Sequence, residues 1–455
     1  MKKSSFLTRF ILACSLVFVV ASWTALGARA QGTTPTPTPR PTATTVVVDA
    51  GSGGTVINYW NGLTGGDGST MNRMVEAFVK ENPSFKVHNE SYEWGIMFQK
   101  LQAAFVAGDP PDVMVMHASE IPQFAKLGIL RSSEDMFDSA GGTLPAADFA
   151  QPSFDATKFE GKRYGVLLDN HGFGTWVNLN LFKNAGVPED TAPPKNADEF
   201  IALATKLTLD KNGMHPNEAG FDAANVTQYG TGIDWVRVQF QSWLYQFGGD
   251  VLSKDGKTAA INSEAGQKAL QFMYDMIYKY KVAPDPAAVG GYNGFQAQKL
   301  AIMPTGTWFR NVLVDQHPEI KWTTWPMIQV GPQPATWVSA HVIFIADGLE
   351  GARLDAAKKF VSFLSNNNQI WADSGQVPAR ISIQSKLDAT KYPSNITIGK
   401  SFQQFGHFDP ANPDITELQN AFDPLLGAAL NGQISVKEAL DKGAAAMQVV
   451  LNKQK

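Results

Sequence analysis

The chain of 455 residues is longer than a single hydrophobic core usually supports, so its length favours two domains. Hydrophobic residues make up 44% of the chain, which is ample for folded cores, and the formal net charge is −4. An acidic chain lacks the surplus of lysine and arginine that binding to phosphate groups requires. Nucleic acid and anionic membrane surfaces are therefore not expected as partners.

Residues 1–30 are typical of an export signal. Basic residues at positions 2, 3 and 9 precede an apolar region, and Ala28-Arg29-Ala30 precedes Gln31. An uncleaved membrane anchor is the alternative, because the apolar region approaches the length that spans a bilayer. The one cysteine, Cys14, lies inside this segment, so the mature chain would have no disulfide and no thiol chemistry. Its net charge would be −8, with 34 basic and 42 acidic residues.

A Thr/Pro-rich tract follows the signal. Residues 32–45 alternate threonine and proline, and proline favours an extended conformation that acts as a semi-rigid spacer. We expect a linker over residues 31–50 and the first folded segment near Gly54. An exported domain held away from a surface would have this organisation.

The first folded unit is expected to alternate strands and helices. Three extended apolar segments (residues 55–60, 85–90 and 111–116) are separated and followed by segments with helical periodicity. A β-α-β-α-β order predicts a parallel sheet with right-handed crossovers, whose ligands bind at the carboxyl ends of the strands. The glycine-rich loop at residues 61–68 lacks the spacing of a nucleotide-binding loop.

The residues just after these three strands are candidates for ligand contacts. They combine aromatic rings with uncharged or acidic hydrogen-bonding groups, which suits a neutral, polyhydroxylated ligand; the alternative is ordinary solvent-facing loop residues. The candidates are Asn61 and Thr64 after the first strand, Trp94 after the second, and His117, Ser119 and Glu120 after the third.

The segment from Gly161 to Gly186 joins the two halves of the chain. An apolar run from Tyr164 to Leu168 stops at polar residues and glycines (residues 169–174), and a second extended run and a short helix follow. Two strands joined in this way form either a turn or a crossing between two lobes. The residues alone leave both alternatives open.

The second half of the chain repeats the mixture of helices and strands. We expect helices near residues 196–207, 234–247, 263–279, 356–364, 418–429 and 435–451, and strands near 299–308, 336–341 and 342–346. The strand near residue 300 breaks at Gly306 and places Trp308 at its exit.

Several segments in the same order resemble the extracytoplasmic solute-binding proteins of ABC importers, family 1, the sugar-binding family that includes maltose-binding protein. The similarity runs from about residue 54 to the C-terminus. The segments that carry it are Asn58-Tyr-Trp-Asn-Gly62, Phe78-Val-Lys-Glu-Asn-Pro83, residues 101–113, Tyr164-Gly-Val, Val177-Asn178, residues 181–186, Phe247-Gly-Gly-Asp250, Ala301-Ile-Met, Gly306-Thr-Trp308 and Val377-Pro-Ala-Arg380.

The resemblance implies an α/β fold of the periplasmic-binding-protein type II, in which two hinge-linked lobes each contain a mostly parallel sheet flanked by helices. The N-terminal lobe would comprise residues 51–170 and 342–398, and the C-terminal lobe residues 171–341 and 399–455. The chain would cross between lobes at residues 169–174, near residues 339–341, and between residues 392 and 403.

The function that the resemblance implies is extracytoplasmic binding of a sugar or oligosaccharide between the lobes, with delivery to the membrane permease subunits of an ABC transporter by hinge closure. The protein would be a monomer, secreted, periplasmic or tethered to the outer face of the cell membrane. It would not be an enzyme and would need no cofactor. Within the family pattern Trp308 would stack on the sugar, and Asp169 or His171 would present a polar group at the first crossing.

Three further residues complete the predicted ligand site. Trp337 and His341 lie beside the second crossing, and Trp243 lies in a helix with apolar neighbours, where a place in the core is an equal alternative. No metal site is predicted, because the seven histidines are scattered along the chain.

Two alternative functions remain at this stage. The same fold could bind a glycerol phosphodiester, a polyol or an amino acid, and Arg163 and Arg310 keep a phosphate ligand open. A secreted carbohydrate-active hydrolase is the more remote alternative, because it would need a pair of carboxyl groups such as Asp169 and Glu120 facing each other. The sequence contains no Gly-x-Ser-x-Gly or His-Glu-x-x-His motif.

Overall fold

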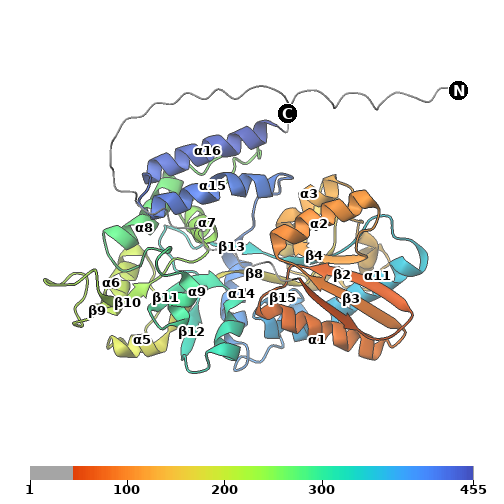
Figure 1. The fold of residues 1–455 in the computed structure, drawn as a ribbon, viewed down its shortest axis with the longest axis horizontal. Coiled ribbons are helices and arrows are strands. Elements are labelled where there is room, and N and C mark those ends of the chain that lie inside the picture. The colour runs from red at the N-terminus through yellow and green to blue at the C-terminus, as the bar shows by residue number, and fades with distance from the viewer. Residues whose placement is uncertain (1–44, 454–455) are drawn as a thin grey trace, which may run out of the picture. The chain divides into compact units, whose positions relative to one another are not determined.

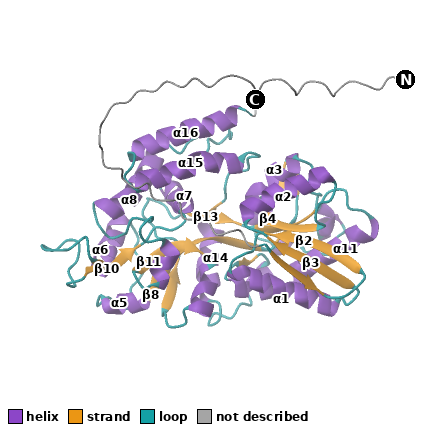
Figure 2. Ribbon diagram, in the orientation of Figure 1, coloured by secondary structure: helices purple, strands orange, loops and turns teal. Residues whose placement is uncertain are grey.

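The computed structural model describes residues 45–453, so the predicted export signal and the Thr/Pro tract up to residue 44 lie outside the described residues. Within this part of the chain, no helix combines the length and the apolar character needed to cross a membrane. Strands gather in two large mixed sheets with helices packed around them (Figures 1 and 2).

The first sheet has six strands and contains the predicted β-α-β-α-β unit. Its strands, in spatial order, are β1 (Val46–Ala50), β3 (Phe85–Ser91), β2 (Thr55–Asn61), β4 (Val113–His117), β14 (His341–Ile345) and β7 (Val166–Leu167). Strands β3, β2 and β4 are parallel, as the alternation of strands and helices predicts. We call the residues around this sheet the first lobe.

Strand β1 corrects the expected linker. Residues 46–50 were expected to be spacer, yet they pair antiparallel with β3 at the edge of the sheet. The reason is local, because Val46, Val47 and Val48 are β-branched and fit a pleated edge strand. The first folded segment therefore begins at Val46 instead of near Gly54.

The second sheet has eight strands and is organised around β8 (Asp169–Asn178), whose ten residues are all buried. Its main path is β16 (Gly406–His407), β13 (Thr336–Ser339), β8, β11 (Leu300–Gly306), β10 (Val226–Thr231) and β9 (Leu209–Asp210); β12 (Trp322–Trp325) and β15 (Val377–Pro378) also pair with β8. We call the residues around it the second lobe. A small ribbon pairs β5 (Lys158–Phe159) with β6 (Lys162–Arg163).

The expectation of mostly parallel sheets is wrong in detail. In the first sheet β1, β14 and β7 run antiparallel to their neighbours, and in the second sheet β8 pairs antiparallel with β11, β12, β13 and β15. Parallel neighbours need a long crossover connection. Strand β14 does not follow β4 through such a crossover, because it enters the first sheet from the second sheet directly after Ala340.

The chain passes between the two sheets three times, and the third passage lies between α12 of the first lobe and β15, which pairs with β8. Leu168 separates β7 of the first sheet from β8 of the second, and Ala340 separates β13 from β14 on the return. Residues 169–174, expected as the crossing itself, instead form the paired first half of β8. The crossing is therefore narrower than the resemblance implied.

The helices divide according to the hydrophobic cores that they cover. Helices α2 and α3 lie on one side of the first sheet and α1 on the other (Figure 1). The first-lobe helices are α1 (Gly66–Glu81), α2 (Trp94–Ala107), α3 (Ile121–Lys126), α4 (Gln151–Asp155), α11 (Gly351–Asn366) and α12 (Asn368–Trp371). The second-lobe helices are α5 (Leu179–Asn184), α6 (Ala197–Leu207), α7 (Val236–Gln246), α8 (Glu264–Tyr278), α9 (Gly291–Gln296), α10 (Phe309–Asn311), α14 (Pro393–Phe405), α15 (Ile415–Leu430) and α16 (Val436–Asn452), and the surface helix α13 spans Ile381–Gln384.

Each lobe has its own buried core. The first core combines the predicted apolar face of α1, including Met74 and Phe78, with the strands of the first sheet. The second core surrounds α7, α8, α15 and α16. A smaller cluster places Ile398 and Phe402 of α14 beside the residues that line β8. The proposed domain bounds put residues 392–398 in the first lobe, whereas Ile398 packs with this second-sheet cluster.

Candidate functional site

The first wall of the candidate site is built where β2 and β3 end. The side chain of Glu93 accepts a hydrogen bond from the backbone N–H of Ile96 and so caps α2, which begins at Trp94. The indole of Trp94 lies directly on Gly62, where an added Cβ would come within 2.0 Å of the ring. Glycine at position 62 is therefore what allows Trp94 to reach the end of the sheet.

The turn after β4 holds His117 through Glu120. The Glu120 carboxylate accepts hydrogen bonds from the backbone N–H of His117 at 3.0 Å and from its Nδ1 at 3.1 Å. Ser119 donates to the other oxygen of the same carboxylate at 3.0 Å. Glu120 and Ser119 thus orient His117, whose ring lies 4.2 Å from that of Trp94.

Asp169 is a fully buried hub at the first crossing. Its carboxylate accepts hydrogen bonds from Nδ1 of His171 (3.1 Å), Nδ1 of His341 (2.7 Å), the backbone N–H of His341 (2.9 Å) and the indole of Trp371 (2.7 Å). Burial alone would raise the pKa of Asp169, but the charge of His341 and the hydrogen bonds from both histidines lower that pKa below its usual value. We therefore expect a carboxylate at this position.

The pKa values of the two histidines that contact Asp169 shift in opposite directions. Burial lowers the pKa of His171 to about 3, helped by the neighbouring charge of His341, so the His171 imidazole is neutral near pH 7. Burial also opposes the charge of His341, but the carboxylate of Asp169 outweighs it and raises the pKa of His341. The pair behaves as one coupled unit around a single carboxylate.

The strand register brings three histidines together. His341 is paired with His117 across β14 and β4, and Ser339 is paired with His171 across β13 and β8. Centroids of the His171 and His341 rings are 4.2 Å apart, and those of His117 and His341 are 5.2 Å apart. Three histidines that are scattered along the sequence therefore meet in space, because the two sheets meet at this point.

The second wall of the site comes from the second lobe. Trp308 follows the end of β11, partly buried, and its ring centroid lies 6.0 Å from that of His171. Trp337 of β13 lies 5.9 Å from His171, and its indole donates to Asp409 at 3.0 Å. Trp308 and Trp337 thus contact His171, whereas Trp94 contacts His117 and His341.

A further contact near the three histidines joins the first lobe to the second. The Asn311 amide of α10 donates to the backbone carbonyl of Gly66 at 3.1 Å, and Gly66 opens α1. A Cβ added at Gly66 would lie 2.9 Å from Cβ of Asn311. The glycine-rich loop that follows β2 therefore faces the second lobe.

Three of the predicted site residues lie elsewhere. Asn61 is fully buried and bonds to Asn89, Ser91 and the backbone N–H of Leu63, so it fastens the end of the sheet. Thr64 is exposed in the loop before α1. Trp243 is fully buried in the second core, and its indole donates to the carbonyl of Ile328 at 3.3 Å. The polar atoms of Asn61 and Trp243 are thus already paired inside the protein, and their ligand roles stay predictions.

Sequence reasoning missed residues that flank Trp308 and His341. Trp235 is 53% exposed, has a φ of 44°, and meets Trp308 edge to face. A bulky residue with positive φ is strained, and such strain gathers at functional sites. Asp67, in the first turn of α1, interacts electrostatically with His341 and Asp169, and burial raises the pKa of Asp67. Neither the backbone angle of Trp235 nor the proximity of Asp67 to His341 can be recognised from the sequence.

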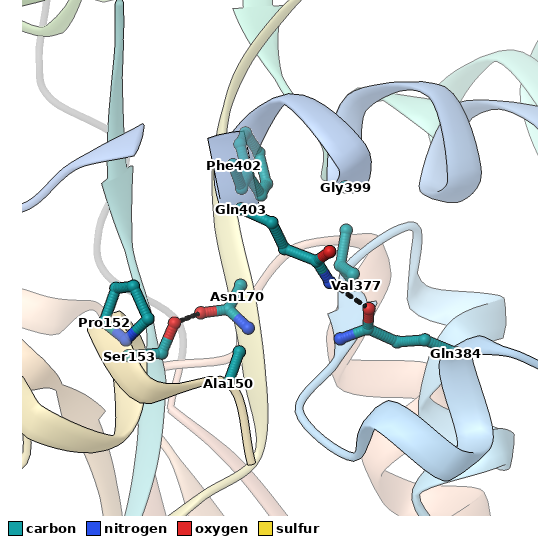
Figure 3. Close-up of a pocket in the computed structure, with 9 residues that line it drawn as sticks. All are labelled: Ala150, Pro152, Ser153, Asn170, Val377, Gln384, Gly399, Phe402 and Gln403. Carbon is teal, nitrogen blue, oxygen red and sulfur yellow. Dashed lines mark hydrogen bonds between the residues drawn. The ribbon is translucent and has the colours of Figure 1, made fainter. Parts of the chain in front are cut away.

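A separate small pocket lies on the other face of β8 (Figure 3). Ser153 donates to the side chain of Asn170, and Gln403 donates to Gln384 at 2.8 Å across the pocket, as Figure 3 shows. Asn170 points away from Asp169 and His171 because successive residues of a strand face opposite sides. The pocket has a volume of about 40 Å³, which has room for water but not for a sugar.

The chain is similar to a known protein family and to individual known proteins. A family model described as bacterial extracellular solute-binding protein matches residues 61–369. A putative binding protein of Brucella abortus is 23% identical over 275 residues, covering 59% of this chain and 61% of the relative, so the chain spans about three fifths of that relative's length. A maltotriose-binding protein of Pyrococcus abyssi is 22% identical over 391 residues, covering 83% of this chain and 78% of the relative.

Solved structures share the fold. An ABC substrate-binding protein of Listeria monocytogenes, solved in complex with cycloalternan, superposes with a TM-score of 0.74 at 24% identity, covering 88% of this chain and 99% of that one. At this level of identity the likeness shows the fold alone. The predicted two-lobed α/β fold class is confirmed.

Proposed function

Because the chain belongs to the family of bacterial extracellular solute-binding proteins, we propose that it binds a sugar or oligosaccharide between its two lobes and delivers it to the permease subunits of an ABC transporter. The observation that carries this proposal is that Trp94 of the first lobe and Trp308 with Trp235 of the second lobe gather around polar groups at the junction of the two sheets.

The chemistry of this arrangement suits a sugar. Indole rings pack against the apolar C–H faces of a sugar ring, while imidazole and carboxylate groups accept or donate hydrogen bonds to its hydroxyls. A dissociation constant of 1 μM corresponds to about −8 kcal/mol. A few stacked rings with five to eight hydrogen bonds, at roughly 1 kcal/mol net each, would supply this free energy.

Closure follows from where the contacts lie. Trp94 and His117 belong to the first lobe, whereas Trp308, Trp235 and Trp337 belong to the second. A solute that touches both groups is bound more tightly by the closed state, so it shifts the population towards closure by the difference in affinity. The narrow connections at Leu168 and Ala340 are the places where the backbone would bend.

We propose the following roles for the predicted residues. Trp308 and Trp94 stack on the solute, and Trp235 provides a third ring beside Trp308. His171 presents its ring to the solute side, since it contacts Trp308 and Trp337, whereas Asp169 lies behind it and holds it in place. Ser119 and Glu120 act by orienting His117.

The names of related proteins support a sugar. The Pyrococcus relative is a maltotriose-binding protein, and the Listeria structure contains cycloalternan. A neutral oligosaccharide is the proposed solute of this chain, and a thermal-shift screen with sugars of different length identifies it.

A phosphorylated solute is the second candidate, and the two arginines that favoured it are engaged elsewhere. Arg163 is buried, donates to the Phe154 carbonyl and to Thr157, and stacks over the Phe154 ring at 3.3 Å. Arg310 donates to backbone carbonyls of Asp373 and Lys391 at 3.3 and 3.0 Å. A neutral solute is therefore favoured over a phosphate, which would need a free arginine or lysine.

The hydrolase alternative is disfavoured by the state of the two carboxylates. Asp169 accepts hydrogen bonds from two histidines and Trp371, and Glu120 is held by His117 and Ser119. A pair of hydrolytic carboxyl groups must face a glycosidic bond from both sides. We therefore propose binding without catalysis.

The proposed location is the outer side of the cell membrane, with the protein acting as a monomer. The family is extracellular, and the predicted export signal and Thr/Pro spacer agree with a secreted, periplasmic or membrane-tethered domain. Fractionation of expressing cells, with and without residues 1–30, tests this location.

Incubation of the purified protein with labelled oligosaccharides tests the function. We expect one sugar bound per chain and no cleavage products. Release of shorter sugars would replace the binding protein with a hydrolase, and failure of every sugar to bind would contradict the choice of solute.

A further inference from the structure

Three histidines from three strands of two different sheets converge at the junction of the lobes. His117 ends β4, His171 lies in β8 and His341 begins β14. Each offers one ring nitrogen, and these three nitrogen atoms lie within 4.8 Å of one another. A tetrahedral zinc site with Zn–N bonds of about 2.0–2.1 Å has nitrogen atoms about 3.4 Å apart. Small ring movements would therefore close this triangle around a metal ion.

The hydrogen bonds of the three rings favour metal binding. In each ring Nδ1 is held by a carboxylate: His117 by Glu120 at 3.1 Å, and His171 and His341 by the two oxygens of Asp169 at 3.1 and 2.7 Å. Within residues 45–453, Nε2 of these rings has no hydrogen-bond partner. Metal-ligating histidines almost always pair the second ring nitrogen with a carboxylate or carbonyl in this way, which fixes the tautomer and raises ligand basicity.

Burial and charge point in the same direction. The side chains of His171 and His341 are 3% and 4% exposed, and His117 is 23% exposed, so one ligand faces the solvent side. Two carboxylates, those of Asp169 and Glu120, contact the three rings directly. A divalent cation held by the three imidazoles would lie close to these two carboxylates, which offset part of its charge.

We propose that His117, His171 and His341 bind a divalent transition-metal ion through Nε2, with Asp169 and Glu120 as positioning residues. Ligands that are all imidazole nitrogens suit zinc, cobalt, nickel or copper, whereas magnesium and calcium prefer oxygen. Three protein ligands leave a fourth position open for water or for an oxygen atom of a solute. Because His171 lies in the second sheet and the other two lie in the first, the ion ties the two lobes together at the crossing.

The site is distinct from the sugar-stacking role of the tryptophans, although it shares the same part of the molecule. Trp94 packs against the rings of His117 and His341, and Trp308 meets His171 edge to face, so neither tryptophan supplies a ligand atom to the metal ion. The metal site can therefore be tested in the absence of any sugar.

Metal titration of the purified protein, first treated with EDTA and dialysed, provides the test. Zn(II) and Co(II) are titrated by calorimetry, and Co(II) is followed by the visible absorption of a tetrahedral complex. We expect one ion per chain, an increase in Tm on binding, and an affinity at least tenfold lower in His117→Gln and His171→Gln. His317→Gln, whose ring bonds to Glu319 and Gln296, is the matched control and should bind as the unaltered protein does.

The positioning role has a readout of its own. Glu120→Gln should retain the fold but weaken metal binding by about 10- to 100-fold, because Nδ1 of His117 loses its carboxylate. A purely structural role of Glu120 would lower Tm without changing metal affinity in the folded protein. His117 is partly exposed, so His117→Gln decides the matter if His171→Gln does not fold.

Several results would overturn the metal site. These are the absence of a stoichiometric ion, an affinity unchanged by His117→Gln, or an octahedral cobalt spectrum that signals binding by surface carboxylates. Sugar binding is measured in parallel on the EDTA-treated protein. Sugar binding without metal binding overturns only the metal site, and metal binding without any sugar response overturns only the proposed solute.

Discussion

Trp235 and Trp308 meet edge to face, with ring centroids 5.7 Å apart and ring planes inclined by 81°. Trp308 is partly buried against the second core, and Trp235 is more than half exposed in a left-handed backbone conformation. Aromatic pairs of this geometry add about 0.5–1.5 kcal/mol beyond their burial. The pair therefore forms a rigid aromatic corner beside His171, at the place where a solute would stack.

Removal of either ring should weaken solute binding more than it weakens the fold. We expect Trp308→Ala to lower the affinity for the bound sugar at least tenfold, about 1.4 kcal/mol, with little change in Tm. Trp235→Ala should lower the affinity by a smaller factor. Calorimetric titration measures both, and Trp322→Ala, a partly buried tryptophan packed on Trp176, is the control. Unchanged affinity in Trp308→Ala would place that residue in the core alone.

Gly62 should control the position of Trp94. An added Cβ would meet the Trp94 ring at 2.0 Å, so Gly62→Ala must displace the indole or the loop after β2. Overpacking of this kind usually costs about 1–3 kcal/mol of unfolding free energy. Denaturant unfolding measures the loss, and the affinity for the sugar should fall as well. Gly54→Ala is the control, since a Cβ there meets nothing within 4 Å; equal losses in both variants would contradict the role of Gly62.

Gly174 is a close-packing position and not a flexible hinge. A Cβ added there would lie 2.5 Å from Cγ1 of Ile398, so β8 and α14 approach each other only because residue 174 lacks a side chain. Gly174→Ala should destabilise the protein by about 1–3 kcal/mol. Combined with Ile398→Ala, the total loss should be smaller than the sum of the single losses by at least about 1 kcal/mol. Additive losses would instead favour the flexible-hinge interpretation.

Asp234 should make the stability of the protein depend on pH. Burial raises the pKa of Asp234 from 3.8 to about 6, although Thr305 donates a hydrogen bond to it. The folded state therefore holds the proton more tightly than the unfolded state. The stabilising contribution is complete below pH 4 and is lost as the pH rises through 6. A shift of this size is worth at most about 3 kcal/mol, less the share of the carboxyl that reaches solvent.

Urea unfolding at two pH values checks this sign. Asp234→Asn should gain stability relative to the unaltered protein at pH 8 but not at pH 4. Asp255→Asn is a control of opposite sign, because the hydrogen bond from Ser253 lowers the pKa of Asp255, and its contribution is present at neutral pH and lost as pH falls. A gain for Asp234→Asn that is equal at both pH values would contradict the raised pKa.

The local structure was predictable wherever the chain has strong periodicity. The helical spacing of apolar residues around Met74 and Phe78 predicted α1. The extended segments that alternate with helices predicted that β2, β3 and β4 are parallel. The direction of β14 was not predictable, because it depends on Ala340 being the only connection to β13 in the other sheet. Strand β1 was hidden by the preceding Thr/Pro tract, although its three valines carry the signal.

The candidate site was predictable in part for a different reason. The ends of the strands pointed to Trp94, His117 and Trp308, which the structure brings to one region. The meeting of residues 117, 171 and 341 depends on the strand register inside each sheet and on the way the two sheets meet, which no local sequence pattern encodes. Asn61 and Trp243 looked equally suitable in sequence, but their hydrogen bonds are completed inside the protein.

A thermal-shift screen tests the central claim most directly. The protein without residues 1–30 is heated with mono-, di- and trisaccharides, polyols, glycerol phosphates and amino acids, alongside the Trp308→Ala variant. A solute at a hundredfold excess over its Kd stabilises the native state by about 2.7 kcal/mol. The account predicts a higher Tm with at least one sugar and a much smaller shift in Trp308→Ala. No shift with any sugar, together with a clear shift by a phosphorylated or amino compound, would contradict it.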